Sequence, residues 1–137
     1  MRFKIDVYSI TVEVHLPNSL KDGLLLYKKL KKKLSLPEEG EEQFEGTVFL
    51  EPKNNSKAHI ILCLSHISHN LVVHECSHLS LKIFMLNNID INIGDIGEGY
   101  CLLNGYIAEK VFYILKKNNI MLYKENTPKN KFIPLGG

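Results

Sequence analysis

The sequence predicts an α+β fold, in which a small β-sheet combines with separate helices. Phe3–Leu16 is rich in β-branched and aromatic residues that partly alternate with polar ones, which is typical of a strand. Phe44–Leu50 and His59–His66 are two short apolar runs with turn residues between them. Apolar residues recur at helical spacing in three other segments.

The first third of the chain predicts a strand followed by a helix. We expect Phe3–Leu16 to be one strand with a bend at Ser9. Ser19 follows a proline and an asparagine and can cap the next helix. Leucines and a tyrosine at helical spacing carry this helix from Leu20 to about Leu36, and Pro37 ends it.

The middle of the chain predicts a hairpin. Glu38–Glu45 reads as an acidic loop that leads into the strand Phe44–Leu50. Pro52–Lys57 contains two asparagines and reads as a turn. We therefore expect Phe44–Leu50 to pair with His59–His66.

Two further helices follow. Ser68 can cap a helix over His69–Leu86, and Ile89–Gly97 reads as a loop with two glycines. The next helix is expected over Glu98–Lys117. Its apolar stripe predicts these core residues: Leu103, Tyr106, Ile107, Val111, Ile114 and Leu115.

Length and charge restrict the range of functions. A chain of 137 residues fits one domain, expected over residues 1–124, with a flexible C-terminal tail at 125–137. The formal net charge of +2 gives no general case for a nucleic-acid partner. The five lysines within Lys28–Lys33 have no aromatic residue among them, so they read as a solvated helix face rather than a phosphate-binding stripe.

The sequence shows neither a membrane span nor a secretory signal. The longest apolar runs fall far short of the ~20 residues that a spanning helix needs, and Met1–Leu16 lacks an apolar block. The three cysteines, Cys63, Cys76 and Cys101, form an odd set without a C-x-x-C pair. This pattern favours a reducing compartment, and the expected location is cytoplasmic.

The motif with the clearest chemical meaning is His74-Glu75-Cys76-Ser77-His78, which has the form H-E-x-x-H. On a helix the two histidines lie one turn apart and only about 40° from each other, so both imidazoles can bind one ion. Glu75 is placed beside them to hold a water molecule as a general base. Cys76 is expected to point away from the histidines and to be a small core residue.

Catalytic zinc takes three protein ligands and keeps one position open. Glu98 begins the next predicted helix, 20 residues after His78, and is the preferred third ligand if the two helices pack antiparallel. Asp90 and Asp95 are weaker alternatives. Gly105 lies on nearly the same face as Glu98 and is expected to let the helices approach closely.

These residues resemble the zincin-like metallopeptidases that use a glutamate as third ligand. More narrowly, they resemble short phage and prophage zinc-dependent peptidases that read H-E-x-x-H, about 20 residues, then E-x-x-A-Y-x-x-G-Y. Here the second part reads Glu98-x-x-Cys101-Leu102-x-x-Gly105-Tyr106, with Cys101 where alanine is common and Leu102 where tyrosine is common. The resemblance covers roughly Phe44–Leu115, about half of the chain.

The resemblance implies a minimal zincin-like domain: a small sheet, a backing helix, a zinc-motif helix and a C-terminal glutamate helix. It also implies a Zn²⁺-dependent hydrolase acting on a peptide or protein substrate in a bacterial cytoplasm, with an edge strand that holds the substrate. The alternative is a phage or prophage interaction module that keeps zinc without catalysis. Candidates for an oxyanion-stabilising group stay open: Tyr100, Tyr106, Tyr113, Tyr123, His66 and His69. His15 and His59 show no ligand spacing and are expected to be ordinary histidines.

Overall fold

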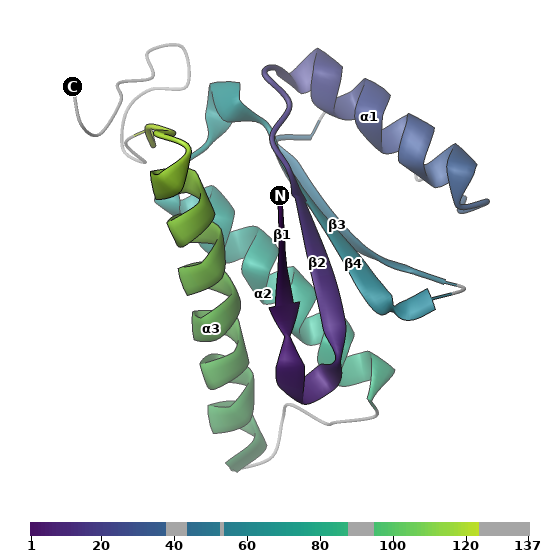
Figure 1. The fold of residues 1–137 in the computed structure, drawn as a ribbon, viewed down its shortest axis with the longest axis vertical. Coiled ribbons are helices and arrows are strands. Elements are labelled where there is room, and N and C mark those ends of the chain that lie inside the picture. Colours follow the sequence, from purple (N-terminus) through teal and green to yellow (C-terminus); the bar gives the residue numbers. More distant parts are fainter. Residues whose placement is uncertain (38–43, 53, 88–94, 124–137) are drawn as a thin grey trace.

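The structure is a computed structural model that describes residues 1–37, 44–52, 54–87 and 95–123 (Figure 1). The described chain forms a small α+β domain with three helices and one four-stranded mixed sheet, as the sequence predicts. The acidic segment 38–43 and the expected C-terminal tail 125–137 lie outside the described residues.

The strands are β1 (Arg2–Ile5), β2 (Ile10–His15), β3 (Gly46–Glu51) and β4 (Asn54–Leu62), and their order in the sheet is β1-β2-β4-β3. β2 and β4 pair in parallel, whereas the β1–β2 and β3–β4 pairs are antiparallel. The predicted hairpin is therefore confirmed. Among the described strands β3 is an edge of the sheet, while β4 is paired on both sides.

The prediction of a single bent strand over Phe3–Leu16 is wrong. The chain reverses there, because Asp6–Tyr8 forms a 3-10 turn and Ser9 has a left-handed backbone with φ 52°. The strand predicted over His59–His66 also lies earlier in the chain than expected. β4 starts at Asn54, inside the expected turn, and ends at Leu62, after which Leu64–His66 form another 3-10 turn.

The helices are α1 (Leu20–Lys33), α2 (His69–Leu86) and α3 (Asp95–Lys117). Ser19 and Ser68 cap α1 and α2 as expected, since their Oγ atoms accept hydrogen bonds from Asp22 N and Leu71 N, each at 3.1 Å. α3 begins three residues before the expected Glu98. No helix within the described ranges has the length and apolar character needed to cross a membrane.

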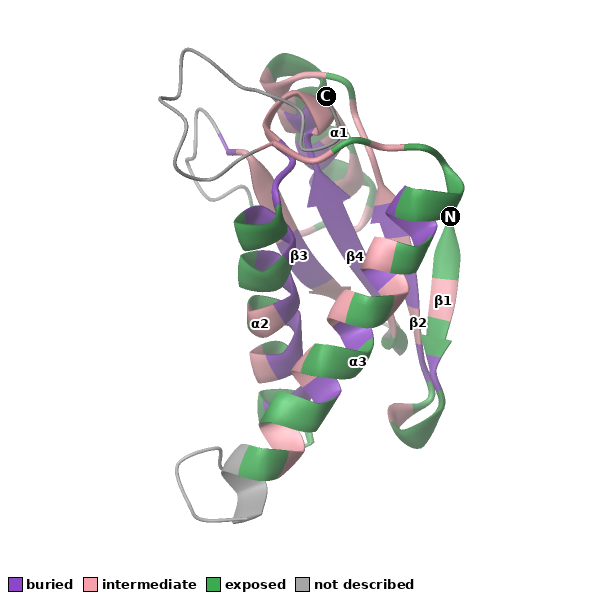
Figure 2. Ribbon diagram, turned by 90° about the vertical axis from the view of Figure 1, so that its left-hand side faces the viewer, coloured by how far each residue is buried: buried purple, intermediate pink, exposed green. Residues whose placement is uncertain are grey.

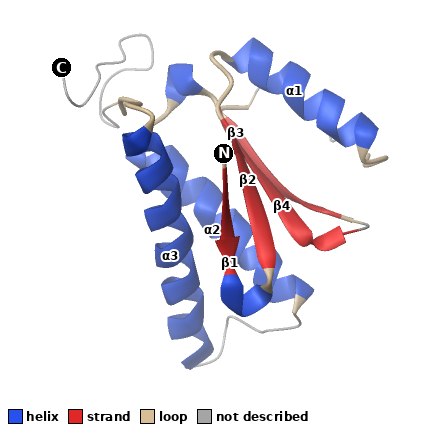
Figure 3. Ribbon diagram, viewed as in Figure 1, coloured by secondary structure: helices blue, strands red, loops and turns tan. Residues whose placement is uncertain are grey.

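The sheet lies between α1 on one side and α2 and α3 on the other (Figures 1 and 3), and it separates two apolar clusters. Val12, Val14, Ile60 and Leu62 belong to the large cluster, to which α2 and α3 contribute their buried faces. Because neighbouring strand residues point to opposite faces, Phe49 and Ile61 point the other way, where Tyr27 of α1 packs in the smaller cluster. Figure 2 shows α2 and α3 with their buried sides toward the sheet.

The apolar stripe of α3 is mostly as predicted. Leu103, Ile107, Val111, Ile114 and Leu115 are buried. Tyr106 is the exception, since it is 36% exposed and its hydroxyl donates to the carbonyl oxygen of Lys4 at 3.1 Å. It lies at the margin of the core rather than inside it.

Candidate metal centre

Helix α2 carries the H-E-x-x-H motif on a side that faces solvent and the sheet edge. His74 and His78 are exposed, and Glu75 is buried with 5% of its surface exposed. Cys76 and Leu79 are buried on the side toward the sheet, which confirms that Cys76 points into the core. The local sequence therefore sets both histidines on one exposed strip and the glutamate at its border.

The two imidazoles converge. Their Nε2 atoms lie 3.2 Å apart, and the ring centroids are 4.7 Å apart. Two nitrogen ligands of one tetrahedral zinc ion, each at about 2.0–2.1 Å, are separated by about 3.3 Å. A carboxylate oxygen of Glu75 lies within 4.8 Å of both histidine nitrogens. These three residues therefore form a candidate metal-binding group, and the donor types suit zinc.

Glu75 is held against β3 at a glycine. A Cβ added at Gly46 would lie 2.9 Å from the carbonyl oxygen of Ile61 and 3.1 Å from Cγ of Glu75. No side chain fits there without displacing its neighbours, so Gly46 permits the close approach of β3 to the glutamate. No pattern in the sequence marks this glycine as part of the site.

A cavity of about 400 Å³ lies beside the motif. Its lining combines the motif with β3 and the first turn of α2: Glu45, Gly46, Ser68, Asn70, Leu71, His74 and Glu75. Asn70 and Glu45 are polar residues that sequence analysis missed. Asn70 precedes His74 by one helical turn, and this spacing is the signal in the sequence that places it beside the motif. Glu45 comes close to the motif only through the placement of β3.

Glu98 is not brought into the group. The described residues contain two groups of three potential ligands within 4.8 Å, and Glu98 belongs to neither. It is exposed and lies on the same side of α3 as Gly105, roughly opposite the buried Ile107. The role of Glu98 as a ligand stays a prediction. Asp90 and the side chain of Asp95 lie outside what the structure describes.

The expectation for Gly105 is wrong. A Cβ added there would meet nothing within 4 Å, so this glycine does not bring the helices together. The helices pack through their apolar faces in the large cluster, and two polar contacts on the neighbouring face of α3 add to this packing. The Tyr100 hydroxyl donates to the carbonyl oxygen of Ser77 at 3.2 Å, and Asn104 Nδ2 donates to Ser77 Oγ at 3.0 Å.

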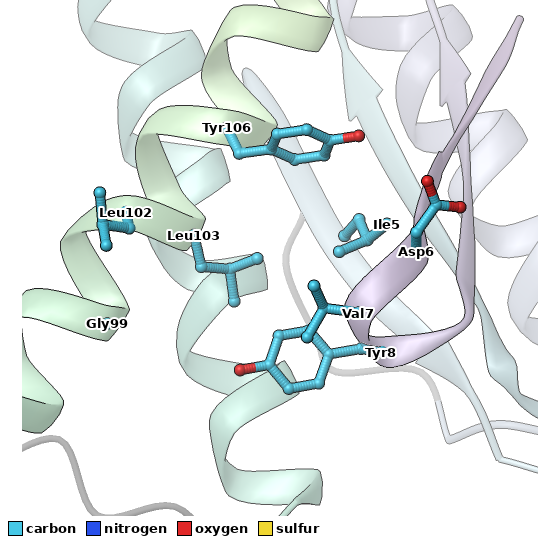
Figure 4. A pocket seen from close by; sticks show the side chains of 8 residues that line it. All are labelled: Ile5, Asp6, Val7, Tyr8, Gly99, Leu102, Leu103 and Tyr106. Atoms are coloured by element: carbon cyan, nitrogen blue, oxygen red, sulfur yellow. The ribbon is translucent and has the colours of Figure 1, made fainter.

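The six residues proposed as oxyanion-stabilising groups all lie outside the lining of this cavity. Tyr100 donates to the carbonyl oxygen of Ser77 within the motif, Tyr106 donates to that of Lys4, and Tyr113 is 64% exposed. Tyr106 also lines a separate cavity of about 390 Å³ between α3 and the β1–β2 connection. Figure 4 shows its largely apolar lining, with Leu103 and Tyr106 facing Ile5, Val7 and Tyr8.

All three cysteines are free, and the two buried thiols have high pKa values. Burial raises the pKa of Cys63 to about 11, and burial together with Glu75 raises that of Cys76 to about 12. A thiolate is the form that acts as ligand or nucleophile. These two cysteines are therefore inert members of the core near neutral pH.

A second group of potential ligands, which sequence analysis did not anticipate, consists of Glu13, His15 and His59. The three residues meet across the parallel pair β2–β4, on the face of the sheet opposite α2. His59 is 3% exposed, and its ring lies between those of His15 and Phe49. The register Glu13↔His59 brings the residues together, although 44 positions separate His15 from His59.

Burial and neighbouring charges set the pKa values of this second group. Burial lowers the pKa of His15, and nearby His59 lowers it further. Burial raises the pKa of Glu13, but Lys57, the histidines and Arg2 outweigh that effect, so this pKa is lowered overall. The group therefore favours a neutral imidazole and an ionised carboxylate.

Fold and site together define a small α+β domain with a candidate metal-binding triad of H-E-x-x-H spacing on α2. No protein-family model matches this chain, and neither a curated protein nor a solved structure matches it. The geometry of the residues themselves is therefore what points to a function.

Proposed function

We propose that the protein is a zinc-dependent hydrolase, and within that class a small metallopeptidase with Glu75 as general base. The observation that carries the proposal is the convergence of His74 and His78, with Nε2 atoms 3.2 Å apart and the buried Glu75 beside them. Free cysteines support a reducing compartment such as a bacterial cytoplasm. The resemblance to phage and prophage peptidases belongs to the same proposal.

His74 and His78 would hold the ion, and a carboxylate would be the third ligand: Glu98, as the sequence predicts, or Glu45, which lines the adjoining cavity. Zinc, when bound, polarises a substrate carbonyl and lowers the pKa of water. Glu75 then accepts the proton of the attacking water at its carboxylate and delivers it to the leaving amine. Contact with Gly46 of β3 limits the positions that the Glu75 side chain can adopt.

β3 offers a route for substrate binding. Among the described strands it is an edge of the sheet, and its first residue, Gly46, lies against Glu75. An extended peptide can add to such an edge through main-chain hydrogen bonds. Asn70 and Glu45, which line the adjoining cavity, would then contact the peptide near the scissile bond.

The first experiment compares Glu75→Gln with Glu109→Gln, an exposed glutamate on α3. Each zinc-loaded protein is incubated with a diverse peptide library, and cleavage is read by mass spectrometry. Glu75→Gln should keep the bound metal and lose turnover by at least about 10²-fold, the scale of general-base catalysis. Glu109→Gln should retain activity. Full activity in Glu75→Gln would overturn the mechanism.

The third ligand is tested separately with Glu98→Gln and Glu45→Gln. Weaker zinc binding in Glu98→Gln alone would support the ligand expected from sequence. Weaker binding in Glu45→Gln alone would assign the role to the carboxylate that lines the cavity. If neither variant changes zinc affinity, the three-ligand centre proposed here is wrong.

A second candidate is a metal-stabilised interaction module without catalysis. The exposed Glu98 favours it, because only two histidines and Glu75 are assembled among the described residues. On this alternative, chelation lowers the melting temperature although the wild-type protein cleaves no peptide. Cleavage that depends on Glu75 excludes it.

A further inference from the structure

We propose that Glu13, His15 and His59 form a second divalent-metal site, distinct from the motif on α2, that takes zinc or another imidazole-preferring ion. Its ligand atoms would be Glu13 Oε2, His15 Nε2 and His59 Nδ1. This proposal does not depend on the hydrolase activity, because the group lies on the opposite face of the sheet.

The separation of the three atoms suits a single metal ion. His15 Nε2 lies 3.0 Å from His59 Nδ1, and Glu13 Oε2 lies 3.9 Å from the former and 3.6 Å from the latter. The circle through three points with these separations has a radius of about 2.05 Å, which falls within Zn–N and Zn–O bond lengths. An ion at its centre therefore reaches all three atoms without movement of the strands.

A second carboxylate, that of Glu51, supports the ring of His59. His59 Nε2 lies 2.8 Å from Glu51 Oε2. Since a carboxylate only accepts, Nε2 carries a proton, and a ring with this single proton presents Nδ1 as an acceptor to His15 and Glu13. Metal-binding histidines usually donate their second ring N–H to a carboxylate in this way, which fixes the tautomer and orients the ring.

The arrangement of charge around Glu13 leaves one of its oxygens facing the histidines. Lys57 Nζ lies 3.6 Å from Glu13 Oε1 and 3.7 Å from Glu51 Oε2. Arg2 also approaches Glu13 through Oε1, at 3.6 Å. The cations thus occupy one oxygen of Glu13, while Oε2 faces the two imidazoles. Side chains of Glu13 and His15 are each 22% exposed, so an ion has access from solvent.

Binding requires one proton to move but none to be released. In the ion-free protein, His15 Nε2 donates to the bare His59 Nδ1 across their 3.0 Å contact. When an ion binds, the neutral His15 ring carries its single proton on Nδ1 instead. The ion then links β2 to β4 directly and β3 through Glu51, so it should stabilise the centre of the sheet.

The experiment measures zinc stoichiometry by equilibrium dialysis and elemental analysis on the full chain. Wild type should bind two ions, and His74→Gln/His78→Gln should retain one. Adding His15→Gln to that double variant should remove the remaining ion. His69→Gln, an exposed histidine outside both groups, is the matched control and should keep both ions.

Two outcomes would overturn the proposal. One is a His74→Gln/His78→Gln protein that binds no zinc while its circular dichroism stays native. The other is a retained ion that His15→Gln does not affect, since it would be bound elsewhere. Neither outcome bears on catalysis, which Glu75→Gln tests separately.

A further readout distinguishes positioning from general structural damage. Glu51→Gln keeps the size of the side chain that holds His59 Nε2 but removes its charge. In the His74→Gln/His78→Gln background we expect zinc affinity to fall about 10–100-fold, the usual effect of losing an outer carboxylate partner. Unchanged affinity would show that the contact of Glu51 with His59 does not position a ligand, which contradicts this part of the proposal.

Discussion

The molecule holds two histidine pairs that are built in different ways. His74 and His78 lie one helical turn apart on α2, and both are exposed. His15 and His59 lie on neighbouring strands, and His59 is 3% exposed within a stack of rings. Replacing the first pair should change the free energy of unfolding little, because solvent already surrounds it. The second pair is part of the packed sheet.

The same contrast explains why only one pair was visible in the sequence. A spacing of four residues on a helix brings side chains together whatever the rest of the fold does. The meeting of His15 with His59 depends on β2 pairing in parallel with β4, which no local pattern specifies. Clusters that form across a parallel sheet are therefore the ones that sequence reasoning overlooks.

The two pairs should differ most in what they contribute to the free energy of unfolding. His59→Ala removes a buried ring and leaves Glu51 without its 2.8 Å partner, so we expect a loss of about 2–4 kcal/mol in the free energy of unfolding. His74→Ala removes an exposed ring and should change it by no more than about 0.5 kcal/mol. Urea denaturation in the presence of a chelator measures both.

Chelator is needed because bound metal would add its own stabilisation to either variant. His69→Ala serves as the second exposed control. Equal losses for His59→Ala and His74→Ala would contradict the difference in burial on which the comparison depends.

A smaller effect tests how β3 approaches the motif. Gly46→Ala forces a Cβ to within 2.9 Å of the Ile61 carbonyl oxygen. Because that oxygen belongs to the backbone of a paired strand, moving it is costly, and we expect a loss of about 1–3 kcal/mol in the free energy of unfolding. The same change at Gly105 meets open space on a helix and should stabilise by about 0.5–1 kcal/mol. Thermal and urea unfolding of the two variants give the comparison.

Opposite signs at the two glycines are the decisive result. If Gly46→Ala is neutral, β3 does not hold Glu75 as described, and its importance for positioning the general base is lost. If Gly105→Ala destabilises, the helix contact that the sequence had suggested exists after all.

Local signals predicted most of the elements but not their pairing. Ser19 and Ser68 cap α1 and α2 as expected, because a cap needs only its own neighbouring residues. The sequence predicts only a bend at Ser9, whereas its left-handed backbone completes a chain reversal that makes β1 a separate strand. The mixed sheet order follows from long-range packing, so neither the edge position of β3 nor the close approach at Gly46 could be deduced.

The candidate site shows the same division between local and distant contacts. His74, Glu75 and His78 converge as the spacing predicts. Glu98 was expected to join them from the next helix, a contact that depends on how α3 is rotated about its axis. Its apolar stripe turns Leu103 and Ile107 into the core and leaves Glu98 on the exposed side.

The two buried thiols should not react in the folded protein. With pKa values raised to about 11 for Cys63 and about 12 for Cys76, both stay protonated at pH 8 in the folded protein. Cys101 is exposed, so iodoacetamide should add one group to the native chain and three in urea, counted by mass spectrometry. Rapid labelling of Cys76 at pH 8 in the native protein would mean that α2 is rotated, and the exposed strip bearing His74 and His78 would have to be reassigned.

The same two thiols predict how stability changes with pH. Burial raises their pKa values in the folded protein, whereas unfolded thiols ionise above about pH 8.5. The free energy of unfolding should therefore fall as the pH rises above this value.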